Sequence, residues 1–188
     1  MAIADSNTHM FLNKNSPSKD GRFDDFFPQS WCGTPMKELL SNPLVINSDF
    51  LSLVPKCAEL VAELLETHST TARLALTGRL NYALKLLLAS LNGMLTKEQE
   101  ELLTIEKKAV VQTDEAFSPD NDTLCEYCLS LTEILLSGAI DEINQKNILG
   151  LLFELVNYLC ESLTTPRFYN SAEGLRYLYN DSLVQNGL

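Results

Sequence analysis

The chain has 188 residues, of which 45% are hydrophobic and 21% are charged. This length suits one domain that buries its own core, and this composition excludes a largely disordered chain. The 25 Asp and Glu residues outnumber the 14 Lys and Arg residues and give a formal net charge of −11. Because phosphate backbones are bound mainly through cationic side chains, we expect no direct binding to nucleic acid.

The sequence contains no recognisable targeting or membrane-spanning segment. Its first residues have neither a basic opening nor a long apolar run, so no secretory signal is predicted. No stretch approaches the length of about 18 uncharged apolar residues that a membrane-spanning helix requires. Five cysteines, an odd number, are typical of free thiols in a reducing compartment. We therefore expect a cytoplasmic protein without membrane association.

Residues 1–35 differ from the rest of the chain, because they are rich in Asn, Ser, Asp, Gly and Pro and show no apolar periodicity. The sequence predicts a flexible arm here and a single helical domain over residues 36–188. Segment 23–31 of the arm is both acidic and aromatic. Its aromatic residues are Phe23, Phe26, Phe27 and Trp31. Two interpretations stay open: the segment docks into a groove on a partner, or its rings pack on the chain's own core.

Helical patterning begins with a short segment from Pro35 to Leu40. A connecting stretch bracketed by Pro43 and Pro55 follows, with Ser48 and Asp49 as the candidate capping residues. From Leu53 to Leu65, apolar residues recur at spacings of three and four, and acidic residues lie beside them. This pattern predicts an amphipathic helix with one solvent-exposed face.

Two later segments, residues 74–95 and 143–163, are apolar around most of a helical circumference. They indicate helices that lie centrally in the domain or pair between chains. Between them, a capping signal at Thr96 predicts a more polar helix, and residues 124–136 predict another apolar one. A last short helix is expected from Ala172 to Val184. The sequence thus predicts an all-α protein, a compact bundle of five to seven helices.

The helical pairs at 57–91 and 128–163 superimpose at an offset of 71 to 72 residues, which aligns Cys57 with Cys128. Leucine-rich helices often match by chance, so duplication and coincidence both stay open. Duplication predicts two similar αα-hairpins packed face to face.

Cys125 and Cys128 have the CxxC spacing of redox pairs and of half a zinc site. A tetrahedral site needs two further ligands, for which His68, Cys57 and Cys160 are the candidates. Cys128 also falls on the apolar stripe of its helix, so packing of two small thiols in the core is the simpler interpretation. We therefore expect no metal and no cofactor, and we keep Cys125, Cys128 and His68 as the metal candidates.

No catalytic motif accompanies these cysteines. The sequence has no glycine-rich phosphate loop, and its paired carboxylates lack the histidine that completes a helical di-metal motif. We expect a protein that is not an enzyme, with a metal- or thiol-dependent enzyme as the third interpretation.

The charge distribution is more informative, because residues 109–145 contain eight Asp and Glu but no Lys or Arg. The residues of this acidic run that we select as an interaction surface are Asp114, Glu115, Asp120, Asp122 and Glu126. A surface that carries charge of one sign attracts a partner that carries charge of the opposite sign. The leading prediction is a cytosolic interaction module, an acidic inhibitor, immunity protein, antitoxin or regulator that binds a basic protein. The alternative is a homodimeric adaptor or secretion chaperone that pairs through helices 74–95 and 143–163.

Overall fold

In a computed structural model of the protein, residues 36–46, 48–106 and 119–184 are described. All of them belong to one compact unit that spans residues 31–188. Several residues selected above lie outside the described residues: Phe23, Phe26, Phe27 and Trp31 of the expected arm, and Asp114 and Glu115 of the acidic run.

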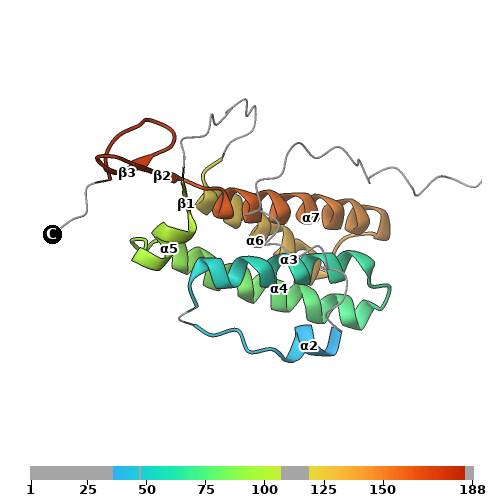
Figure 1. The fold of residues 1–188 in the computed structure, drawn as a ribbon. Helices are drawn as coiled ribbons and strands as arrows, with labels where there is room; N and C mark the ends of the chain where they lie inside the picture. The colour runs from blue at the N-terminus through green and yellow to red at the C-terminus, as the bar shows by residue number, and fades with distance from the viewer. Residues whose placement is uncertain (1–35, 47, 107–118, 185–188) are drawn as a thin grey trace, which may run out of the picture. The chain divides into compact units, whose positions relative to one another are not determined.

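Four long helices form the body of this unit: α3 (Phe50–Glu66), α4 (Thr70–Leu91), α6 (Asn121–Ser137) and α7 (Glu142–Thr164). Both α3 and α6 pack against α4 and α7, which places α3 diagonally opposite α6 and α4 diagonally opposite α7 (Figure 1). Short connections join α3 to α4 and α6 to α7, giving two αα-hairpins. The expected helical bundle is therefore present.

Each long helix begins at a side chain that accepts a hydrogen bond from the backbone N–H three residues later. These capping residues are Asp49, Ser69, Asp120 and Asp141. Such caps satisfy a backbone donor that the first helical turn leaves unpaired. Asp49 and Asp120 are 71 residues apart and begin helices of equal length, 17 residues each. The capping positions therefore follow the same offset as the sequence repeat.

Leucine dominates the core between the four helices. The largest fully buried side chains are Leu53, Leu60, Leu64, Leu76, Leu80, Leu84, Leu87, Leu103, Leu124, Leu152, Leu159 and Leu163. Burial of one such side chain contributes roughly 1.5–3 kcal/mol to folding. The apolar character of α4 and α7 is thus largely accounted for by packing within one chain. Among the described helices, none combines the length and apolar content needed to cross a bilayer.

The N-terminal part of the unit begins with α2 (Met36–Ser41), which contacts α3 and α4. Helix α3 starts earlier than the sequence indicated, because Pro55, expected in a connecting stretch, lies inside the helix. Proline lacks the N–H that would bond to the carbonyl four residues earlier. The Asp49 cap and the burial of Phe50 and Leu53 in the first turns offset that loss.

The prediction of an all-α fold is wrong in two segments. Helix α5 (Lys97–Leu102) is shorter than the polar helix expected there, and it leads into strand β1 (Thr104–Ile105). Strand β1 pairs in parallel with β2 (Phe168–Ser171), and β2 pairs antiparallel with β3 (Gly174–Tyr177). The protein is therefore mostly helical with a small three-stranded sheet.

The helix predicted over residues 172–184 is wrong, because the chain forms the turn and second strand of a hairpin there. Pro166 follows the end of α7, and aromatic residues such as Phe168 pack well on a pleated surface. Gly174 has a φ of 126°, which side-chain-bearing residues rarely adopt and which no helix contains. The Phe168 and Tyr177 rings meet across the hairpin, with centroids 5.2 Å apart. Apolar spacing alone did not distinguish this hairpin from a short helix.

Candidate functional site: a cavity at one end of the bundle

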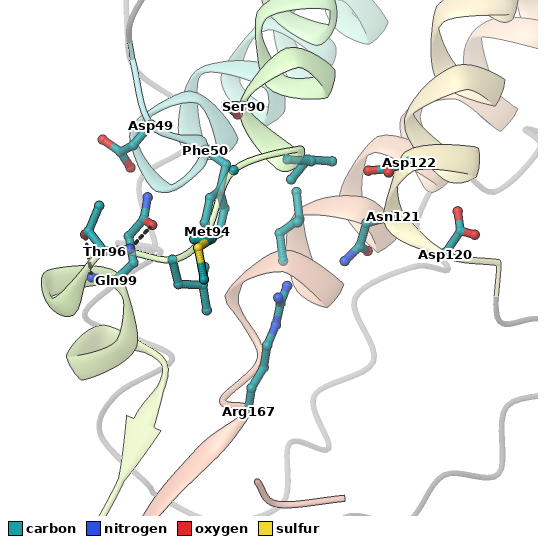
Figure 2. A pocket seen from close by; sticks show the side chains of 14 residues that line it. Asp49, Phe50, Ser90, Met94, Thr96, Gln99, Asp120, Asn121, Asp122 and Arg167 are labelled. Atoms are coloured by element: carbon teal, nitrogen blue, oxygen red, sulfur yellow. Dashed lines mark hydrogen bonds between the residues drawn. The ribbon is translucent and has the colours of Figure 1, made fainter. Parts of the chain in front are cut away.

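An open cavity of about 420 Å³ lies where α3 and α6 begin and where α4 and α7 end (Figure 2). We call it the bundle-end cavity. Ligand pockets commonly have volumes of ~300–1,000 Å³. Its walls combine the first residues of α3 and α6, the last turns of α4 and α7, the segment 93–96, Gln99 of α5, and Arg167, which precedes β2. Polar helix caps therefore face apolar last turns across the opening.

Three carboxylates line the bundle-end cavity: Asp49, Asp120 and Asp122, all of them exposed. Asp49 accepts a hydrogen bond from the Ser52 N–H at 3.1 Å, and Asp120 accepts one from the Thr123 N–H at 2.8 Å. Hydrogen bonding to Thr123 lowers the pKa of Asp120 below its ordinary value, because the bonds favour the charged form. The structure thus brings two of the predicted interaction residues, Asp120 and Asp122, to the cavity.

Among the described residues that line the cavity, Arg167 is the one Lys or Arg. Its backbone is held beside the sheet: its N–H donates to the Leu103 carbonyl, and its own carbonyl accepts from the Leu178 N–H, both at 2.9 Å. The side chain is half-buried and points into the cavity (Figure 2). Loss of hydration on burial lowers the pKa of the Arg167 guanidinium. Within ranges 36–46, 48–106 and 119–184, no residue forms an ion pair or hydrogen bond with that guanidinium.

Asn121, the first residue of α6, lies across the cavity from Arg167. The Ser162 hydroxyl donates to Asn121 Oδ1 at 2.7 Å. This bond uses one of the two lone pairs of the amide oxygen, and the Nδ2 group donates to no described residue. In Figure 2 the Asn121 amide nitrogen and the Arg167 guanidinium point toward one another. Two hydrogen-bond donors therefore point toward each other, and neither has an acceptor among the described residues.

The exposed face of α6 carries a row of carboxylates that starts at the cavity. We call Asp120, Asp122, Glu126 and Glu133 the acidic stripe; all four are exposed. Asp122, Glu126 and Glu133 lie within about 40° of one another around the helix, because they are four and eleven residues apart. Glu133 Oε1 is 3.9 Å from Lys85 Nζ, an exposed pair that contributes little stability. Helix α6 itself contains no Lys or Arg.

Comparison with known proteins assigns no function to these features. The chain matches no protein-family model, no curated protein and no solved structure. The bundle-end cavity and the acidic stripe are therefore interpreted from their geometry and chemistry.

The cysteines of the CxxC pair lie in the core and not in the cavity. Cys125 and Cys128 are buried with Cys57 of α3 and Cys160 of α7, and the four thiols are close enough to interact electrostatically. Burial raises the pKa of Cys125 and of Cys128 to about 12, so both remain protonated at neutral pH. The Cys125 thiol donates to the Leu84 carbonyl at 3.4 Å. Protonated thiols are poor nucleophiles and poor metal ligands.

His68 does not join this cluster. It is exposed and follows the C-terminal end of α3, whereas Cys125 lies near the start of α6, at the cavity end of the bundle. The helical rise separates them by on the order of 20 Å along the bundle axis. No group of three or more His, Cys, Asp or Glu in the described ranges is arranged to hold a metal ion.

Helices α4 and α7 correspond to the segments that the sequence suggested as a dimer interface. Because they occupy diagonal corners of the bundle, their outward faces look in opposite directions. Each retains exposed apolar side chains: Leu74 and Tyr82 on α4, and Ile143 and Leu151 on α7. One flat interface therefore cannot contain the outward faces of both helices from the same chain.

Sequence reasoning did not select Arg167 or Asn121, because the cavity is assembled from segments between residues 49 and 167. One signal was present: Arg167 is the only Lys or Arg between Lys146 and Arg176. Pro166, Phe168 and Tyr169 flank it, and a cation beside a proline and two aromatic residues marks a guanidinium whose surroundings need an explanation. Asn121 carries no comparable signal.

Proposed function

We propose that this protein is a non-enzymatic, cytosolic interaction module that binds a basic protein partner through the acidic stripe of α6. The supporting observation is the stripe itself: four exposed carboxylates on a helix without Lys or Arg. Only Glu133 lies within ion-pair distance of a cation in the part of the chain that the structure describes. An inhibitor, immunity protein, antitoxin or regulator is the class of protein that this surface suits.

Carboxylates of like charge on one helix face repel one another, and a partner's Lys and Arg side chains replace that repulsion with attraction. The long-range field also raises the rate of encounter with a cationic surface. Salt screens both effects, since the Debye length falls to about 8 Å at physiological ionic strength. Binding through the stripe is therefore expected to weaken as salt concentration rises.

The test is affinity capture from a lysate of the native host, at low and at high salt, followed by mass-spectrometric identification. The bait is either the natural chain or a triple variant, Asp120→Asn, Asp122→Asn and Glu126→Gln. Asparagine caps helices as well as aspartate, so the first substitution keeps the start of α6 intact. We expect the natural chain to capture a basic protein at low salt and the triple variant to lose it.

A matched variant separates the stripe from net charge. Glu66→Gln, Glu154→Gln and Glu161→Gln remove three exposed carboxylates from α3 and α7 and change the net charge equally. This variant should retain the partner. Equal loss of capture by both variants would contradict binding through the stripe, because it would show that overall charge alone was responsible.

A second candidate is the homodimeric adaptor or chaperone, with α7 as the contact. Ile143 and Leu151 support it, because they are 76% and 50% exposed on the same helix. Sedimentation equilibrium would then give a mass that rises with concentration toward twice the 21.0 kDa of one chain. Ile143→Lys with Leu151→Lys should return the mass to that of one chain. A strict monomer at high concentration removes this candidate.

A further inference from the structure

We propose that the bundle-end cavity binds a small monocarboxylate with an apolar body, whose carboxylate lies between the Arg167 guanidinium and the Asn121 amide. The ligand class is that of short-chain to medium-chain fatty acids and similar amphiphilic acids. This inference does not rest on the proposed binding of a basic protein, because its anchors, Arg167 and Asn121, do not belong to the acidic stripe; Asp120 and Asp122 belong both to the stripe and to the rim of the cavity.

The first argument is the unmet hydrogen-bonding capacity of Arg167. A guanidinium carries five N–H donors in a planar fork and stays charged at neutral pH. In the described chain, no side chain or carbonyl accepts from it, although the side chain is half-buried and has lost part of its hydration. A carboxylate matches this fork with two parallel hydrogen bonds. Its attraction is stronger in a partly dehydrated cavity than in bulk water.

The second argument is the orientation of Asn121. The hydrogen bond from Ser162 to Asn121 Oδ1 leaves Nδ2 directed toward the Arg167 guanidinium (Figure 2). Neither group can satisfy the other, because both are donors. A carboxylate placed between them accepts from both. The pair therefore selects an anionic acceptor and rejects a cation.

The third argument is the apolar surface beside these donors. Phe50 and Leu163 are buried in the cavity wall, and Leu91 and Leu95 are half-buried. Met94, at the opening, is 94% exposed. A flexible, polarisable methionine adapts to an irregular apolar ligand. An alkyl body that extends from the carboxylate would cover this surface, as is typical of small-molecule sites with few polar anchors.

The charge of the rim limits the ligand to one negative charge. Asp49, Asp120 and Asp122 stand around the opening, and Arg167 is the only cation among the described residues that line it. A phosphate monoester carries about −1.5 to −2 at neutral pH, so the three carboxylates repel it more strongly than a carboxylate. The site should therefore prefer a carboxylate over a phosphate with the same alkyl chain.

The experiment is isothermal titration calorimetry of the full chain with four probes that share one alkyl chain: octanoate, octyl phosphate, octylamine and 1-octanol. We expect saturable binding of octanoate at one site, and binding at least about tenfold weaker for the other three probes. A tenfold ratio of affinities corresponds to the lower end of the free energy that a hydrogen bond to a charged group contributes.

Two variants test the anchors. Arg167→Gln should weaken octanoate binding at least about tenfold. Asn121→Asp keeps an acceptor for Ser162 but places a carboxylate opposite Arg167, so it should abolish octanoate binding. The Glu66→Gln, Glu154→Gln, Glu161→Gln variant, which changes no cavity residue, should bind octanoate as the natural chain does. Thermal unfolding of each variant shows that it is folded.

Three results would each overturn the proposal. Absence of octanoate binding at millimolar concentration would show that the cavity is not a carboxylate site. Equal affinities for octanoate and 1-octanol would show apolar partitioning only. Unchanged octanoate affinity in both Arg167→Gln and Asn121→Asp would show that the facing donors do not hold the ligand. None of these results bears on capture of a basic protein by the acidic stripe, so the two proposals can fail separately.

Discussion

The Asn81 amide of α4 donates a hydrogen bond to the Thr132 hydroxyl of α6 at 2.8 Å, and both side chains are buried. The Thr132 hydroxyl in turn donates to the Leu129 carbonyl at 2.7 Å. This polar link lies in a core whose largest buried side chains are leucines. An unpaired buried amide costs free energy, so a shift of α4 along α6 is disfavoured. The pair therefore helps to fix the register of the two helices.

Thr132→Val should lower the free energy of unfolding by about 1–3 kcal/mol, because it leaves the buried Asn81 amide without its partner. The double variant Asn81→Leu and Thr132→Val should recover part of that loss, since no polar group is then left unpaired. Urea unfolding of the two single variants and the double variant measures the coupling. Strictly additive effects would show that the hydrogen bond contributes nothing specific.

Leu152 and Leu151 are neighbours on α7 with opposite environments, 0% and 50% exposed. Leu152→Ala should cost about 2–5 kcal/mol, because it removes buried methyl groups and leaves a cavity in the core. Leu151→Ala should change stability by less than about 1 kcal/mol, as is usual for exposed positions. Chemical unfolding of both variants compares them directly. Similar losses at the two positions would indicate that the outward face of α7 is covered, as in the homodimer.

Substitution by alanine should have opposite effects on the free energy of unfolding at Gly174 and at Gly78. Gly174→Ala should lower the free energy of unfolding by more than about 1 kcal/mol, because a φ of 126° is unfavourable for alanine. Gly78→Ala should raise it by up to about 1 kcal/mol, because Gly78 lies inside α4 and an added Cβ meets no atom within 4 Å. Stabilisation by both substitutions would instead favour the helix that the sequence suggested over residues 172–184.

The buried thiols make stability dependent on alkaline pH. Burial raises the pKa of Cys125 and Cys128 from 9.0 to about 12. Below pH 9 both thiols are protonated in the folded and unfolded states, so their contribution is fully present. Between pH 9 and 12 they ionise only in the unfolded state, so the free energy of unfolding should fall with rising pH. The urea midpoint measured at about pH 8 and about pH 10.5 should show this fall.

Cys125→Ala with Cys128→Ala is the control for that experiment. The double variant is expected to be less stable at every pH, but its midpoint should depend less steeply on alkaline pH, because two of the buried thiols with raised pKa are gone and only Cys57 and Cys160 remain. In the folded natural chain, Cys125 and Cys128 should also resist a thiol reagent at neutral pH until urea unfolds them. Rapid reaction of either thiol in the folded protein would support the thiol-dependent enzyme.

The long helices could be predicted from the sequence because each of them carries local signals. Apolar spacings of three and four predicted α4, α6 and α7 to within a few residues at their ends, and of the two candidate caps Ser48 and Asp49 the structure uses Asp49. The segment after Pro166 was not predicted correctly, because Leu175, Tyr177 and Leu178 fit a helical face as well as a strand. Pairing with β2 decided between them, and that pairing is a contact between segments.

The sequence by itself determined that the chain folds into apolar helices with an acidic surface, since helix periodicity, capping and charge are local properties. Only the tertiary structure decided that α4 and α7 stand at diagonal corners, which separates their exposed faces. It also decided that Asn121 faces Arg167, residues 46 positions apart. Such arrangements depend on how distant segments pack against one another, and a spacing pattern within one helix carries no information about the helix it will meet.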